Sequence, residues 1–260
     1  MLKNKLTLQN FCYLVLAIVI TLGFSYSALA QKRKPVTKPK TTTPAPTPTP
    51  TPVKPPEPET IRPPETLLSV EEMEKLVAVV ELDENREFTL AFYPKSAPNH
   101  VRQFIWLARA GYFNGMSISR VIPKYIVQSG NPGSWEENNP NLKKRFDIPK
   151  LKAEYDQALK HEKGSLSMAR PNGEPDGGTS HFFICTERFP SLDNQYSIFG
   201  HVVSGMEIVS QLSLLAIAEG TTDKPAERVA IKQILIKEIA AVPAETTPKE
   251  TEPKTNDSSN

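Results

Sequence analysis

The chain has 260 residues, a formal net charge of +2 at pH 7 and 38% hydrophobic residues. This near-neutral balance, without a basic face interleaved with aromatic residues, does not imply a nucleic-acid partner. The four histidines, at positions 100, 161, 181 and 201, lack the spacing of metal ligands. We therefore expect neither a metal site nor another cofactor.

The first thirty residues have the pattern of an export signal. Lys3 and Lys5 give a positive start, and a nearly unbroken apolar run follows over residues 11–24. Residues 28–30 (Ala-Leu-Ala) then form the small-x-small pattern of a cleavage site. We predict a signal peptide over residues 1–30 and an exported, periplasmic protein. The alternative is an uncleaved N-terminal anchor, because residues 11–30 are about long enough to span a bilayer.

Residues 31–67 are predicted to be a proline- and threonine-rich linker. Proline has no amide donor and a fixed φ, so the segment is expected to be an extended, solvated polyproline II spacer without a core. At the other end, residues 243–260 show no apolar period and are predicted to form a disordered tail. The intervening residues 68–242 have a suitable length for one domain with its own core.

Within this domain, alternating and apolar runs predict many short strands and two helices. Residues 76–82 and 87–92 form a hairpin signal. Residues 96–98 are expected to open a helix, with Ser96 as its N-cap and Pro98 in its first turn, and a second helix is expected near 206–214. This composition indicates a mainly β fold, either an antiparallel barrel or a sandwich. The remaining strand candidates are 118–122, 126–128, 165–169, 182–186, 198–203 and 229–238.

Four sequence blocks follow the second predicted strand in a fixed order. They are RVIPKYIVQSG at 120–130, GSLSMA at 164–169, SHFFICT at 180–186 and LDNQYSIFGHV at 192–202. Together they resemble the cyclophilin family of peptidyl-prolyl cis-trans isomerases, over about residues 77–239. The resemblance implies a closed eight-stranded antiparallel barrel capped by two α-helices. It also implies that proline-containing segments of unfolded or exported proteins bind to it.

The resemblance assigns two catalytic residues and a peptide-binding surface. Arg120 matches the arginine that favours the twisted prolyl amide, and Gln128 matches the glutamine that holds the substrate backbone. The even offset between them would put both on one face of a regular strand. The matched substrate-binding positions are Tyr125, Ile126, Ala169, Arg170, His181, Phe183, Leu192 and Tyr196.

Several positions depart from the family pattern. Ser191 replaces a tryptophan of many eukaryotic members, so tight cyclosporin binding is not expected. Arg170 replaces the usual asparagine and His181 the usual glutamine, which leaves the substrate preference open. Two functions remain: an isomerase that assists the folding of exported proteins, and a non-catalytic peptide-binding or chaperone module on an extracytoplasmic stalk. The retention of Arg120 and Gln128 favours the enzyme, which is expected to be a monomer.

Overall fold

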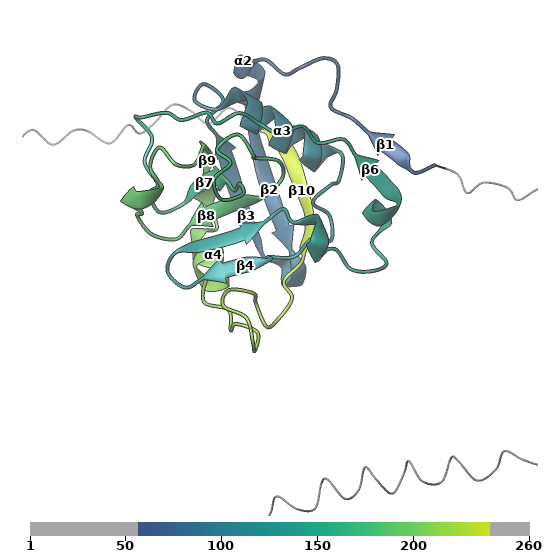
Figure 1. The fold of residues 1–260 in the computed structure, drawn as a ribbon. Helices are drawn as coiled ribbons and strands as arrows, with labels where there is room; N and C mark the ends of the chain where they lie inside the picture. The colour runs from purple at the N-terminus through teal and green to yellow at the C-terminus, as the bar shows by residue number, and fades with distance from the viewer. Residues whose placement is uncertain (1–56, 240–260) are drawn as a thin grey trace, which may run out of the picture. The chain divides into compact units, whose positions relative to one another are not determined.

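The computed structural model describes residues 57–239 (Figure 1). The predicted signal peptide (1–30), most of the predicted linker (31–67) and the predicted tail (243–260) lie outside the described residues. Among residues 57–239, no helix has the length and apolar character needed to cross a membrane.

The centre of the fold is one sheet of eight strands, in which every neighbouring pair is antiparallel. The prediction of a mainly β fold with eight antiparallel strands is therefore confirmed. Across the sheet the strands are β10 (Ile231–Glu238), β2 (Leu76–Leu82), β3 (Glu87–Phe92), β9 (Ile198–Ser204), β7 (Ser165–Met168), β8 (Phe182–Cys185), β5 (Ile126–Ser129) and β4 (Arg120–Ile122).

The expectation of a closed barrel is wrong, because no ladder joins β4 to β10 and the sheet stays open between these edges. The chain before β4 meets the start of β10 only through isolated main-chain bonds, such as Ile118 N–H to Val229 O at 2.9 Å. β4 itself is only three residues long. Its outward Val121 N–H donates to Asp223 O at 2.8 Å, so a loop covers this edge in place of a strand.

Helices α3 (Pro98–Arg109) and α4 (Met206–Leu212) correspond to the two predicted helices, and a short α2 (Val70–Met73) was not predicted. The expected N-cap of α3 is wrong by one residue. Ala97 occupies the N-cap position, and the Ser96 hydroxyl donates instead to Asp156 Oδ2 at 2.6 Å. The first turn of α3 is capped from a distant loop by Glu154.

The core lies between α3 and the sheet, around the fully buried ring of Phe104. This ring contacts four other phenylalanine rings at centroid distances of 5.1 to 5.8 Å. Burying one such side chain contributes roughly 1.5–3 kcal/mol, so this cluster is a main source of stability. The four partner rings are Phe92, Phe113, Phe182 and Phe199.

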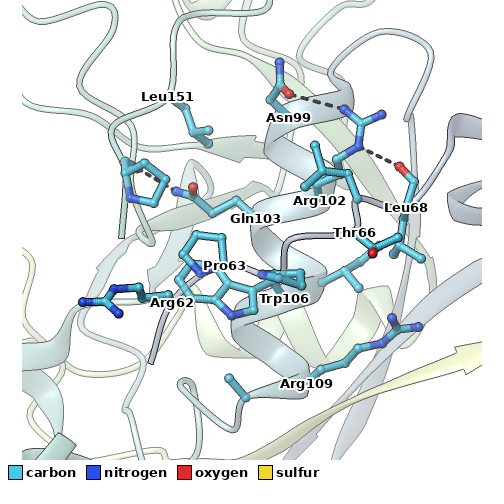
Figure 2. A pocket seen from close by; sticks show the side chains of 15 residues that line it. Arg62, Pro63, Thr66, Leu68, Asn99, Arg102, Gln103, Trp106, Arg109 and Leu151 are labelled. Carbon is cyan, nitrogen blue, oxygen red and sulfur yellow. Dashed lines mark hydrogen bonds between the residues drawn. The ribbon is translucent and has the colours of Figure 1, made fainter. Parts of the chain in front are cut away.

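The N-terminal part of the described chain forms a strap, residues 57–68, of which residues 57–67 belong to the segment predicted as linker. Here β1 (Glu59–Ile61) pairs in parallel with β6 (Lys144–Phe146). Such pairing uses main-chain groups, so it left no apolar pattern in the sequence. Figure 2 shows the end of the strap beside α3, where Arg102 Nε donates to Leu68 O at 2.7 Å. Strap and helix enclose a hollow of about 590 Å³ lined by Trp106.

Glu154 is a suitable position for testing how α3 is anchored. Its carboxylate accepts hydrogen bonds from the backbone N–H groups of Asn99 and His100 at 3.1 Å. The same carboxylate lies 2.6 Å from Nδ1 of the His100 ring. Burial alone would raise the pKa of Glu154, but these hydrogen bonds outweigh it and hold the pKa below its ordinary value. A negative charge at a helix N-terminus is stabilising.

We expect Glu154→Gln to lower the free energy of unfolding by about 1–2 kcal/mol, because it removes a charged cap while keeping the side-chain shape. The measurement is urea unfolding at neutral pH. The matched control is Glu174→Gln, which breaks an exposed pair with Lys150 and should cost under about 1 kcal/mol. Equal losses in the two variants would contradict this account of α3.

Candidate active site

Arg120 and Gln128 face each other across a hairpin. The sequence predicted separate strands at 118–122 and 126–128, and Tyr125 N–H bonds to Ile122 O at 2.9 Å where the chain turns between β4 and β5. Arg120 and Gln128 are direct cross-strand partners, and such partners share a face of the sheet. Arg120 Nη1 accordingly lies 3.4 Å from Gln128 Oε1 and donates to it.

The Arg120 guanidinium is held by a residue that the sequence analysis missed. Its Nε donates to Asp223 Oδ2 at 2.6 Å, and the two side chains are 38% and 34% exposed. Asp223 lies in the loop between α4 and β10, about a hundred positions along the chain, so no local pattern could connect the two. The pairing fixes the guanidinium through Nε and leaves Nη2 free of a protein hydrogen bond within the described residues.

The apolar side of the site comes from β8. Successive side chains of a strand point to opposite faces, so Phe182 enters the core while Phe183 faces away from it. Phe183 packs with Ile126 and Cys185 in a separate apolar cluster. The Tyr196 ring stands perpendicular to the Phe183 ring, with centroids 5.3 Å apart.

These elements enclose a groove of about 390 Å³. Nine of the ten predicted site residues line it, together with Asn172, which was not predicted. The lining residues are Arg120, Tyr125, Ile126, Gln128, Ala169, Arg170, Asn172, Phe183, Leu192 and Tyr196.

His181 is the predicted site residue that does not line this groove. It lies one position before β8, and its carbonyl accepts the Ala169 N–H at 2.9 Å. Burial lowers the pKa of the half-buried His181 side chain. Its main chain thus positions Ala169, while a role for its side chain in binding stays a prediction.

The groove presents hydrogen-bond donors and apolar surface rather than an activated nucleophile. Cys185 is fully buried beneath it, and burial raises the pKa of this thiol to about 12. A thiol reacts as its thiolate, so Cys185 is inert at neutral pH. Residues 57–239 also contain no group of three or more His, Cys, Asp or Glu side chains arranged to hold a metal ion. The larger hollow beside the strap contains none of the predicted site residues.

A buried polar network supports the groove from below. His161 is fully buried and stacks on Phe183, with ring centroids 6.2 Å apart and planes inclined by 9°. Its Nδ1 lies 3.0 Å from Asp193 Oδ1, and Arg188 Nη2 donates to Asp193 Oδ2 at 2.7 Å. Burial lowers the pKa of His161, and its Nε2 has no hydrogen-bond partner among residues 57–239. Both observations indicate a neutral ring that donates through Nδ1.

This network predicts a specific loss of stability in acid. Burial would raise the pKa of Asp193, but hydrogen bonds from His161 and Arg188 lower it from 3.8 to about 2. A carboxyl with a depressed folded pKa stabilises the fold above its unfolded pKa, and this contribution disappears as the pH falls through the folded value. We therefore expect the stability difference between wild type and Asp193→Asn to be full at pH 6 and to shrink between about pH 4 and pH 2.

Urea unfolding across this pH range measures the difference. The control is Asp147→Asn, whose carboxylate is 61% exposed and makes a 3.7 Å contact with Arg62. This variant should differ little from wild type at any pH. A wild-type advantage over Asp193→Asn that stays constant from pH 6 to pH 2 would contradict the proposed ionisation.

Comparisons with known proteins agree with this geometry. The pattern of the family described as "Cyclophilin type peptidyl-prolyl cis-trans isomerase/CLD" matches residues 77–236. "Peptidyl-prolyl cis-trans isomerase-like 1" of Aspergillus fumigatus is 34% identical over 145 residues, which cover 55% of this chain and 85% of that protein. A peptidyl-prolyl cis-trans isomerase of Arabidopsis thaliana is also 34% identical over 145 residues, covering 55% of this chain and 84% of the relative.

Solved structures share the fold. A cyclophilin-type isomerase of Cryptosporidium parvum, crystallised in the presence of the dipeptide Ala-Pro, is 24% identical and superposes with a TM-score of 0.54. The likeness covers 63% of this chain and 99% of that one. A cyclophilin of Hirschia baltica is 21% identical with a TM-score of 0.51, covering 63% of this chain and 74% of the other. This chain belongs to the cyclophilin-type peptidyl-prolyl cis-trans isomerases.

Proposed function

We propose that the groove binds an X-Pro segment and accelerates cis-trans isomerisation of its amide bond without a covalent step. The observation that carries this proposal is the position of the Arg120 guanidinium. It is anchored by Asp223 and Gln128 in the same groove that Phe183 lines. A fixed donor thus stands in one groove with an apolar surface suited to a proline ring.

The chemistry requires only binding that is selective for the twisted bond. Amide resonance resists rotation, with a barrier near 20 kcal/mol. Twisting removes the conjugation and leaves a pyramidal, more basic prolyl nitrogen. A donor that favours this nitrogen acts mainly in the transition state, and only such interactions raise the rate. A guanidinium suits the task because it does not lose its proton in proteins.

The other lining residues offer two kinds of contact to the peptide, apolar surface for the proline ring and a carboxamide for the backbone. Phe183, Ile126 and Leu192 offer apolar surface for the proline ring. Gln128 offers a carboxamide, which can both donate to and accept from the substrate backbone. If the ring is held while the residue before it is free to turn, rotation concentrates at the X-Pro bond.

The decisive variant is Arg120→Ala, which we expect to lower kcat/KM for an X-Pro peptide by about 100-fold, as for the loss of one preorganised donor. Asp223→Ala keeps the guanidinium but removes its anchor, so a loss of about tenfold is expected. Exchange NMR on a proline peptide measures both. Arg145→Ala, an exposed arginine on β6, is the control that should retain wild-type activity. Wild-type activity in Arg120→Ala would overturn this mechanism.

We further propose that the enzyme assists the folding of exported proteins. The support is the sequence of residues 1–67, with its signal-like start and proline-rich spacer. In the anchored alternative, residues 31–56 in polyproline II conformation, at about 3.1 Å per residue, could hold the domain about 80 Å from the membrane.

Mass spectrometry of the protein recovered from the periplasmic fraction tests this localisation. We expect a mature N-terminus at Gln31, because cleavage should follow the small residues at 28–30. A chain that retains Met1 and sediments with membranes would support the anchored alternative. A chain that stays in the cytoplasmic fraction would contradict export altogether.

A further inference from the structure

Arg170 is held in a fixed position at the groove. Its Nε and Nη2 donate to Gln195 O at 3.2 and 3.0 Å, and its Nη1 donates to Pro171 O at 3.2 Å. Its guanidinium carbon also lies 4.8 Å from the centroid of the Tyr196 ring, a cation–π contact. Three hydrogen bonds and a ring contact thus order a side chain that would otherwise sample many rotamers.

The charge of Arg170 is not neutralised by any carboxylate within salt-bridge distance in the described part of the chain. The two acidic residues of the adjoining loop are engaged elsewhere. Glu174 pairs with Lys150, and Asp176 accepts the Ala153 N–H. Arg120, the other arginine of the groove, is paired with Asp223. The groove lining contains no Asp or Glu, so it carries one uncompensated positive charge.

The donors that remain on Arg170 are of the kind that a carboxylate accepts. A guanidinium has five N–H groups, and three are used by the two backbone carbonyls. One N–H on Nη1 and one on Nη2 remain. Arginine and carboxylate groups commonly form two parallel hydrogen bonds, an arrangement that a lysine or an asparagine cannot reproduce.

We propose that Arg170 selects substrate peptides with an Asp or Glu within two residues of the proline. This inference rests on the proposed function, in which the proline ring occupies the surface of Phe183. The centroid of the Tyr196 ring lies 4.8 Å from the Arg170 guanidinium carbon and 5.3 Å from the centroid of the Phe183 ring. The guanidinium carbon is therefore within about 10 Å of the Phe183 ring. An extended chain advances at most about 3.6 Å per residue, so an acidic side chain one or two residues from the proline can reach it.

The competing explanation is that Arg170 only stabilises the conformation of the loop that carries Gln195 and Tyr196, a bracing role. The two explanations differ in what a substitution does to selectivity. Loss of a brace would slow isomerisation of all peptides by the same factor. Loss of a carboxylate site would slow acidic peptides alone, and the preference would weaken with salt because the interaction is partly exposed.

The test compares peptides that differ only by Glu or Gln next to the proline, on either side and at one or two positions. At low salt the wild type should process the best Glu peptide about 5–10-fold more efficiently than its Gln partner. This ratio should fall toward one in Arg170→Gln and as salt rises in the wild type. Arg145→Gln removes the same charge from exposed strand β6 and should retain the wild-type ratio.

The outcomes separate the two proposals. A wild-type ratio near one at every position, with both peptides catalysed, overturns the inference and leaves the isomerase intact. An unchanged ratio in Arg170→Gln, with both rates lowered equally, also overturns it and assigns Arg170 the bracing role. Failure of the wild type to catalyse exchange in either peptide overturns the proposed function, and the inference with it.

Discussion

The placement of two adjacent phenylalanines on β8 is the constraint on which the site depends. Because strand side chains alternate, Phe182 joins the rings around Phe104 and Phe183 must face the opposite side. The stability of the core therefore fixes the position of the groove wall. A slip of one residue in the pairing of β8 with β5 would exchange the two rings, so the register needed for folding is also the register needed for binding.

The side of the groove that carries Arg120 depends on a sheet edge that is left unpaired. The edge of β4 is not paired with β10, and the loop that covers it supplies Asp223. The same residue accepts the Val121 N–H through its carbonyl and the Arg120 Nε through its carboxylate. The open edge thus gives Arg120 an anchor that fixes its position without consuming all its donors.

Much of the fold and most of the groove could be predicted from the sequence. Alternation placed the strands, and nine of the ten residues that the resemblance proposed for the site line one groove. The missed features depend on distant or main-chain contacts. Glu154 caps the first turn of α3, and Asp223 pairs with Arg120. Each lies far along the chain from the residue that it contacts. The pairing of β1 with β6 leaves no apolar period.

The central claim is that this groove lowers the barrier to rotation about an X-Pro bond by non-covalent contacts alone. The most direct measurement is two-dimensional exchange NMR of an Ala-Pro peptide in the presence of a small amount of the wild-type protein. The account predicts that the cis-to-trans and trans-to-cis rates both rise by the same factor, with the cis:trans ratio unchanged. Exchange at the rate of the peptide alone, under conditions in which the protein binds the peptide, would contradict it and identify a binding module instead.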